Sequence, residues 1–322
     1  MSLHLVPRPL RYVEAVAEYG SVQAASRALG IAASAIDRHI RALEEASQAP
    51  LFERQPRGMR PTAAGEAVIV LARRWRADAE RLDTGLKEMR GLEHGTVRMA
   101  AMDSLANGVL IDLVDWLQRE HLRIHLSLDV VTPSEAAREL EDGTVDVVAA
   151  FNLPQQRHQH RIWTEQLPFG CAVAPHHPLA AFSETTLKAL GDYTMVSQSS
   201  ALPIRQYLDS RYGWFFSEKE PMLATNSLQL LKQVLKTGSL AMITSELDAL
   251  PEIEAGDLVF VPLRDRDLKP QTISVAIDVR RPLLRAARIV AEYVAETAAR
   301  RLQAVREGNL ARLAKAQAEA SR

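Results

Sequence analysis

The chain has 322 residues, of which 47% are hydrophobic and 25% charged, and its formal net charge at pH 7 is -1. This composition is typical of a globular protein of two or three domains. No run reaches the roughly 18 apolar residues of a membrane span, and the first residues lack the apolar core of a secretory signal. We therefore expect a cytoplasmic protein without a membrane partner.

The cysteine and histidine residues give no sign of a redox or metal centre. Cys171 lies in the apolar run FGCAVAP, so we expect an inert buried thiol. His158, His160, His176 and His177 have no cysteine or carboxylate at ligand spacing, and solvated loop histidines are the simpler interpretation. The motifs G-x-S-x-G, P-loop and G-x-G-x-x-G are absent. We expect no metal, no cofactor and no catalytic residue.

The near-zero net charge hides an uneven distribution. Residues 1–62 carry eight arginines, no lysine and six acidic residues, a net charge of +2. Residues 280–322 carry ten basic and four acidic residues, a net charge of +6, so the middle of the chain is acidic. Clustered charge is a better guide to a polyanionic partner than the total charge.

The first 62 residues predict three helices and a ribbon. Apolar positions at helical spacing over 10–19 stop at Gly20, and Ser21 is an N-cap for a helix over 22–29 that ends at Gly30. A third helix is expected over about 32–46. Its inner stripe is Ile36, Ile40 and Leu43, and its outer face carries Ser34, Asp37, Arg38, Arg41 and Glu45. The run LFERQPRGMRPT then predicts a short ribbon or wing.

A long helix is expected to start at Ala63, capped by Thr62. Its apolar positions follow an a/d spacing for about three heptads, as Val68, Ala72, Trp75, Ala79, Leu82, Leu86 and Met89. Such a seam favours pairing between two chains. The alternative is a helix that packs on its own domain.

From Gly95 onward, strands alternate with helices, which indicates an α/β domain with a parallel sheet. Strands are expected at 96–102, 123–131, 145–151, 169–174, 193–198, 240–244, 258–263 and 272–279. Helices are expected at 105–121, 134–143, 228–238 and from about Pro282. From residue 301 the chain is polar and rich in alanine and arginine, and predicts a helical tail.

In open α/β sheets, ligands bind outside the carboxyl ends of the strands. The predicted strand ends carry small polar residues, namely Asp103, Ser104, Thr132, Asn152, Ser199, Ser200, Thr225, Asn226 and Thr244. Hydroxyls and N–H groups at helix starts favour a small anionic or polar organic molecule, although each residue could equally be a helix cap. Asp103 beside Ser104 argues against a carboxylate bound at that point.

Two helices joined by a tight turn, the second with arginines on its polar face, are typical of a helix-turn-helix whose second helix enters the major groove of DNA. The segments GSVQAASRALG, SAIDRHIRALEE, LFER and RPTAAGE stand in that order. As a set they resemble the winged helix of LysR-type transcriptional regulators over residues 10–66. LEDGTVDVVAAF, VAPHHPLA and VLKTGSLAMIT resemble landmarks of that family's effector domain.

The resemblance implies a fold in four parts. These are an N-terminal all-α winged helix-turn-helix over 1–62, a linker and dimerisation helix over 63–93, a two-lobed α/β effector-binding domain over 94–300, and a polar helical tail over 301–322. The effector domain is similar to type 2 periplasmic binding proteins. Its lobe I covers about 94–165 and 266–300 and its lobe II about 166–265, with an effector pocket between them crossed by two strands near 165 and 265.

The resemblance also implies site residues and partners. Double-stranded DNA is contacted by Ser34, Asp37, Arg38 and Arg41 of the recognition helix and by Arg54 and Arg57 of the wing; the alternative is that these arginines form weak surface ion pairs. A dimer forms through Val68, Trp75, Leu82, Leu86 and Met89, and two dimers form a tetramer. Ala32, Ala33 and Asp37 depart from the residues usual in the family, so no base code is carried over.

We therefore expect a sequence-specific transcriptional regulator that responds to a small polar or anionic effector. Two other classes stay open. The α/β domain could belong to an enzyme or to a solute-binding protein, with the N-terminal helices serving as an oligomerisation module. Loss of DNA binding on replacing the recognition-helix arginines separates the regulator from both.

Overall fold

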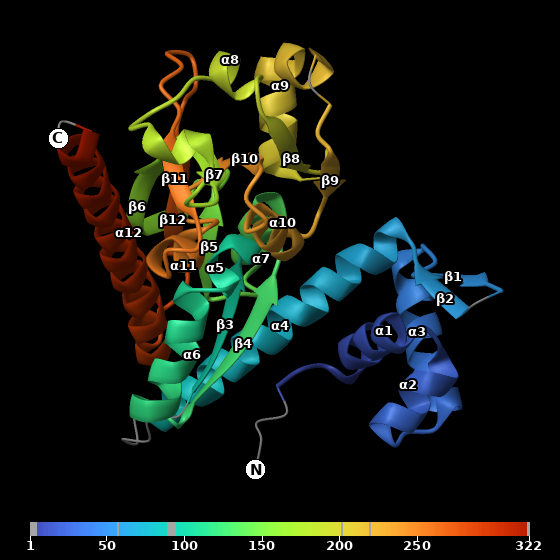
Figure 1. The fold of residues 1–322 in the computed structure, drawn as a ribbon. Coiled ribbons are helices and arrows are strands. Elements are labelled where there is room, and N and C mark those ends of the chain that lie inside the picture. Colours follow the sequence, from blue (N-terminus) through green and yellow to red (C-terminus); the bar gives the residue numbers. More distant parts are fainter. Residues whose placement is uncertain (1–4, 57, 89–94, 201, 219, 321–322) are drawn as a thin grey trace.

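The computed structural model describes residues 5–56, 58–88, 95–200, 202–218 and 220–320. A small N-terminal domain lies apart from a larger α/β part, and one long helix connects them (Figure 1). The predicted fold class is confirmed: a winged helix-turn-helix is followed by a two-lobed α/β domain with two sheets. None of the helices in these described segments is long and apolar enough to cross a membrane.

The N-terminal domain consists of three helices and a hairpin. These are α1 (Arg8–Tyr19), α2 (Val22–Leu29), α3 (Ala33–Ser47), β1 (Phe52–Gln55) and β2 (Gly58–Pro61). As the sequence predicts, the hydroxyl of Ser21 caps α2 by accepting from the N–H of Ala24 at 3.1 Å, and Gly30 ends it with φ 65°. Buried Val13, Ile36 and Ile40 lie at the centre of the core.

Two contacts hold the wing against the helices. The N–H of Met59 donates to the carbonyl of Gly20 at 2.8 Å. Gly58, with φ 132°, permits this approach, because a Cβ there would lie 2.4 Å from the same carbonyl oxygen. At the other end, Oε1 of Glu44 on α3 accepts from the N–H of Leu51 at 2.8 Å. The hairpin is therefore fixed relative to α3.

The connecting helix α4 (Ala63–Glu88) packs on both parts of the chain. Thr62 caps it, accepting from the N–H of Gly65 at 3.0 Å. Its first turns pack on α1, and its later turns reach lobe I. There Nε of Arg81 lies 2.7 Å from Oδ1 of Asp146, and both side chains are largely buried. This ion pair holds the end of α4 against lobe I.

Lobe I is built on a five-stranded sheet with the order β4-β3-β5-β12-β6. Its elements are β3 (Gly95–Ala101), α5 (Asp103–Ala106), α6 (Val109–Glu120), β4 (Ile124–Val130), α7 (Pro133–Asp142), β5 (Val147–Phe151), β6 (Gln159–Leu167) and β12 (Gln271–Asp278). β3 is parallel to β4 and β5, whereas β12 is antiparallel to β5 and β6. Buried side chains of this sheet, α6 and α12 form a core.

Lobe II has a second five-stranded sheet, ordered β11-β7-β10-β8-β9. Its elements are β7 (Phe169–Val173), the 3₁₀ turn η1 (Pro178–Ala181), α8 (Leu187–Leu190), β8 (Thr194–Gln198), α9 (Pro203–Glu218), β9 (Leu223–Thr225), α10 (Leu228–Leu235), β10 (Leu240–Ser245), α11 (Leu250–Glu254) and β11 (Val259–Pro262). The expectation of parallel sheets is wrong for both lobes. β7 is antiparallel to β10 and β11, because the chain crosses between the lobes after β6 and again before β12.

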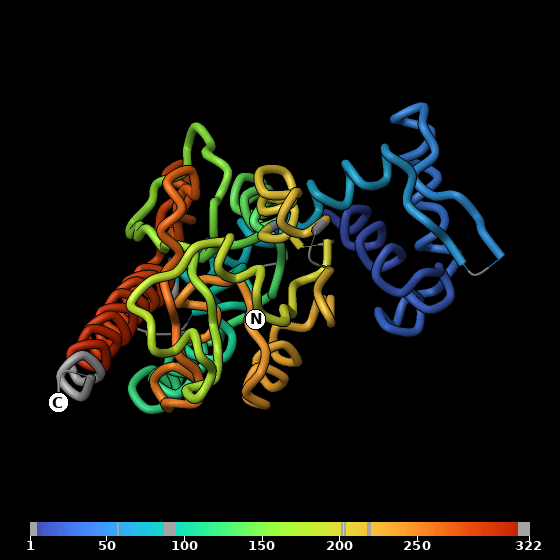
Figure 2. The backbone as a smooth tube through the Cα atoms, turned by 45° about the horizontal axis from the view of Figure 1, so that its top comes forward, coloured from blue at the N-terminus to red at the C-terminus, as the bar shows by residue number. Residues whose placement is uncertain are grey.

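The last helix, α12 (Arg285–Ala320), is 36 residues long and continues without a break through the predicted tail. Leu302 and Val305 are buried, so the expected boundary at residue 300 falls inside a packed helix. Arg301 binds Glu254 of the lobe II segment at 3.0 Å and Asp112 of lobe I at 3.2 Å. In both views, α12 lies on the side of the α/β domain away from the winged helix (Figures 1 and 2).

Cys171 lies at the centre of lobe II and is fully buried. Burial raises the pKa of its thiol to about 12. Because the thiolate is the reactive form, the native protein at pH 8 should not react with the thiol reagent DTNB, and one thiol should react after unfolding in guanidinium chloride. Absorbance at equal protein concentration measures both. Rapid reaction of the native protein would contradict the buried position.

Candidate DNA interface and effector cleft

The recognition helix α3 presents one polar face to solvent. Ser34, Arg38 and Arg41 are exposed and Asp37 is half-buried, whereas Ile36 and Ile40 on the opposite face are buried. Spacings of three and four residues place the exposed side chains on one side of the helix. The structure therefore brings the four predicted contacts of this helix together.

The charges on this face are only partly compensated. Nε of Arg41 lies 2.8 Å from Oδ2 of Asp37, and the two side chains are 64% and 38% exposed. Arg38 has no ion pair or hydrogen bond with the described residues. An exposed pair of this kind contributes little to stability and can be exchanged for a phosphate contact. Glu44, which could have paired with these arginines, binds the N–H of Leu51 instead.

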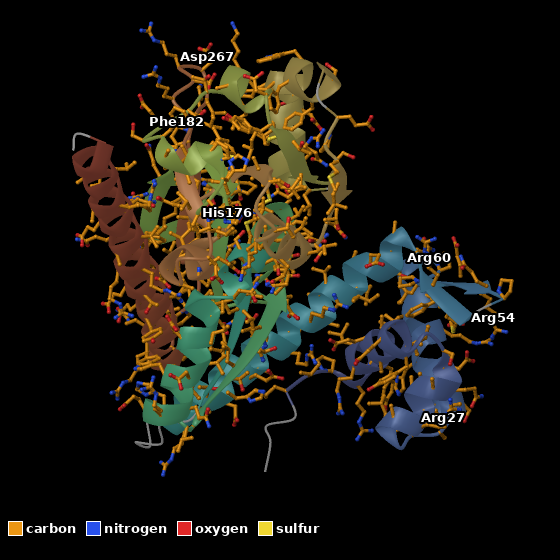
Figure 3. All side chains as sticks on the ribbon, in the orientation of Figure 1. Arg27, Arg54, Arg60, His176, Phe182 and Asp267 are labelled. Atoms are coloured by element: carbon orange, nitrogen blue, oxygen red, sulfur yellow. The ribbon has the colours of Figure 1, made fainter. Side chains whose placement is uncertain are left out.

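A hollow of about 500 Å³ lies between α2, the start of α3 and the wing. Its lining residues are Ser21, Val22, Gln23, Ala33, Ser34, Asp37, Arg54, Gln55, Gly58 and Met59. Ala32 stands at the cap position of α3 without a side-chain hydrogen bond, so the first N–H groups of the helix remain open to a phosphate. Arg54 lies on the outer hairpin (Figure 3). Arg57 lies outside the described residues.

The predicted dimer seam divides into two parts. Val68 packs against the core of the winged helix and Ala72 is buried, as the alternative interpretation expected. Trp75, Leu82 and Leu86 are 45%, 51% and 39% exposed. Met89 lies outside the described residues. The exposed part of α4 is thus an apolar surface that the single chain does not cover.

A second site is a cavity of about 340 Å³ between the two lobes. It is lined by Met102, Asp103, Ser104, Pro133, Ser134, Phe151, Asn152, Pro154, Gln198, Leu202, Ile204, Tyr207, Asn226, Leu228, Asp248 and Gln271. Four of the predicted effector residues are among them: Asp103, Ser104, Asn152 and Asn226. The rule that ligands bind at the carboxyl ends of strands therefore points to the edge of both sheets where this cavity lies.

The other five predicted effector residues do not line this cavity, because local structure occupies them. Thr132 caps α7 by accepting from the N–H of Glu135, and Thr225 accepts from the N–H of Ser227 at 3.2 Å. Thr244 is buried and donates to Asp248 at 2.6 Å. Ser199 and Ser200 form hydrogen bonds through their main chains, Ser199 with Thr225 and Leu202 and Ser200 with Gln206.

Among the polar residues that line the cleft, Gln198, Tyr207, Asp248 and Gln271 were not predicted from the sequence. Asp248 lies only three residues beyond β10, and its buried carboxylate accepts from Ser104, Thr244 and Ser245. Gln271 is the first residue of β12 and is 3% exposed. The rule that ligands bind at strand ends would have included Asp248 if it had been applied to the whole loop after β10. No sequence signal marks Gln271, because the β6–β12 pairing that positions it was not predicted.

Profiles of two known families match this chain. The one described as "Bacterial regulatory helix-turn-helix protein, lysR family" matches residues 7–66, and the one described as "LysR substrate binding domain" matches residues 90–299. Among curated proteins, the chain is similar to the RuBisCO operon transcriptional regulator of Allochromatium vinosum. The identity is 28%, over 67% of this chain and 70% of that protein.

Solved structures share the fold of the whole chain. A full-length variant of OxyR from Pseudomonas aeruginosa aligns with a TM-score of 0.63 and 17% identity, covering 91% of this chain and 95% of that one. Full-length CbnR in complex with its target DNA aligns with a TM-score of 0.61 and 20% identity, covering 89% and 99%. Because the substrate-binding profile alone spans more than half of the sequence, this chain belongs to the LysR family of transcriptional regulators.

Proposed function

We propose that this protein recognises a DNA site through α3 and the wing, and that a small polar organic effector in the cleft changes how it binds that site. The observation that carries the first part is the exposed face of α3 beside an uncapped helix start and Arg54. Arginines and helix N-termini bind phosphates, and side chains on the same face reach base edges. CbnR, whose fold this chain shares, was solved in complex with its target DNA, which supports DNA as the partner.

The decisive experiment is fluorescence anisotropy of the full chain with DNA from upstream of its own gene and with scrambled DNA of the same length. Non-specific binding depends on phosphate contacts and falls steeply with salt. We expect a preference for the upstream DNA that persists as the salt concentration rises. Equal and strongly salt-sensitive binding to both would place the site elsewhere. No binding to either DNA at low salt would contradict the proposal.

We further propose that two chains pair through the exposed part of α4. Replacing Leu82 and Leu86 together by glutamate should halve the mass measured by light scattering, because charges would lie in an apolar helix seam. Leu310→Glu is the matched control, since Leu310 is 68% exposed on another helix, and it should leave the mass unchanged. An unchanged mass of the double variant would assign the dimer to another surface.

We place the protein in the cytoplasm and expect it to act as a regulator and not as an enzyme. The curated proteins to which this chain is similar include transcriptional regulators. Within the described segments, no group of three or more His, Cys, Asp and Glu side chains could hold a metal ion. A tetramer of two dimers is proposed from the family alone, and analytical ultracentrifugation of the full chain distinguishes it from a dimer.

A further inference from the structure

The charge balance of the cleft distinguishes between the two expected effector classes, an anionic and a polar molecule. Two of its lining residues are carboxylates, Asp103 and Asp248, and none of its described lining residues is lysine, arginine or histidine. The nearest recorded guanidinium contact is that of Arg205 with the main-chain carbonyl of Gln198 at 3.5 Å. That guanidinium already binds Asp209 at 2.7 Å and Ser197 at 2.8 Å. The charged side chains that line the cleft are therefore both acidic, and no free cation is among them.

The side-chain hydroxyl donors at the carboxylate end are already used. Ser104 donates its hydroxyl proton to Oδ1 of Asp248, so only the lone pairs of Ser104 remain for a ligand. Oδ2 of Asp248 accepts from Thr244 at 2.6 Å and from the N–H and hydroxyl of Ser245. Oδ1 keeps one acceptor position. Asp103, exposed beside Ser104, has no hydrogen bond or ion pair among the described residues. This end of the cleft offers acceptors.

Other lining groups offer donors. The amide nitrogen of Gln271 is buried and has no hydrogen-bond partner among the described residues, although the side chain lines the cavity. A buried amide without a partner costs free energy, which a ligand acceptor would recover. Oδ1 of Asn152 accepts from the N–H of Thr272 at 3.0 Å, so Asn152 has its NH₂ group left to offer. Both donors are neutral.

We propose that the effector of this protein carries an ammonium group, bound at Ser104, Asp103 and Asp248, and a neutral carbonyl or hydroxyl acceptor bound by Gln271. An ammonium group has three donors and no acceptor, which matches the acceptor end of the cleft. Phe151, Tyr207 and Leu228 supply an apolar wall for the body of the molecule. This inference rests on the proposed function, and it narrows the expected polar or anionic effector to a polar one that carries a cation.

Three benzamides that differ only at the meta position test the charge. They are 3-(aminomethyl)benzamide, 3-(hydroxymethyl)benzamide and 3-carbamoylbenzoate, which carry an ammonium, a hydroxyl and a carboxylate and share the amide acceptor. Titration calorimetry of the full chain should rank them in that order. Each step should be about tenfold in affinity, since two carboxylates act in a partly screened site.

Two variants locate the bound molecule. Asp103→Asn should lower the affinity for the ammonium compound about fivefold and leave the affinity for the alcohol unchanged. The reason is that the substitution removes only the charge of an exposed side chain. Gln271→Met, of similar size, should weaken all three compounds alike through loss of the amide donor. The anisotropy of DNA binding, measured without any compound on the same samples, reports separately on the proposed function.

The outcomes separate clearly. The predicted ranking with both variant effects supports the inference. Tighter binding of the carboxylate compound, or equal binding of all three, overturns the ammonium assignment. Absence of heat from every compound at millimolar concentration also overturns it. If DNA binding is normal in these cases, the regulator proposal stands while the effector class is wrong.

Discussion

Replacing Glu252 by alanine should lower the free energy of unfolding by about 3–5 kcal/mol, because it leaves a buried ammonium without its partner. Nζ of Lys232 on α10 lies 2.9 Å from Oε1 of Glu252 on α11, and the two side chains are 1% and 9% exposed. This pair joins two helices on the same side of lobe II. Urea unfolding followed by circular dichroism measures the change.

Two controls decide whether burial is the cause. The nearby pair Lys236–Asp257 has a similar distance of 2.7 Å but is 32% and 48% exposed, so Asp257→Ala should cost less than about 1 kcal/mol. The double variant Lys232→Met with Glu252→Leu should regain most of the loss, because apolar residues of similar size can replace a buried pair. Equal effects of Glu252→Ala and Asp257→Ala would show that the pair is not buried.

The winged helix could be predicted almost to the residue because its signals are local. The caps at Ser21 and Thr62 and the stop at Gly30 act within one helical turn, and the inner stripe of α3 follows one period. The contact between Glu44 and Leu51 was not predicted, although both lie in the quoted motifs. Nothing in the spacing shows that the carboxylate of Glu44 accepts from a main-chain N–H seven residues further along the chain.

The two lobes were predicted less completely because their organisation depends on distant pairings. β6 has a polar sequence and an exposed side, so it lacks the apolar run of a buried strand, and it is specified by its pairing with β12. Asp248 and Gln271 reach one cavity from different parts of the chain. Periodicity within a short window carries no information about either contact.

The contacts of helix α12 with the two lobes were also not predicted, and they bear on how the lobes around the cleft can move. Arg306 lies 3.1 Å from Glu165 of lobe I and 2.7 Å from Glu246 of the lobe II segment. Burial raises the pKa of Glu246, and hydrogen bonding to Arg306 opposes this shift. The polar composition of this segment predicts a helical tail, and it does not show that Arg301 and Arg306 connect the two lobes. Relative movement of the lobes on effector binding must therefore be compatible with these contacts.

Replacing Arg38 and Arg41 together by alanine should weaken binding to the DNA site about 100-fold, since each contact of this kind contributes roughly 1–3 kcal/mol. Both side chains are exposed on α3, and Arg38 has no competing partner among the described residues. The loss should come without a change in unfolding midpoint, because exposed arginines hold no core. Anisotropy titrations at several salt concentrations measure the affinity and its salt dependence.

The control uses a matched pair elsewhere in the chain. Arg119 on α6 forms an exposed i,i+4 pair with Asp115, as Arg41 does with Asp37, so Arg119→Ala removes the same charge from the same local setting. It should leave DNA affinity within about twofold, because a charge far beyond the Debye length of about 10 Å is screened. If both arginines contact phosphates, the salt slope of the double variant should fall by about 2. Normal affinity of the double variant would show that α3 is not the recognition helix, whereas lost affinity with an unchanged slope would assign the arginines to base edges.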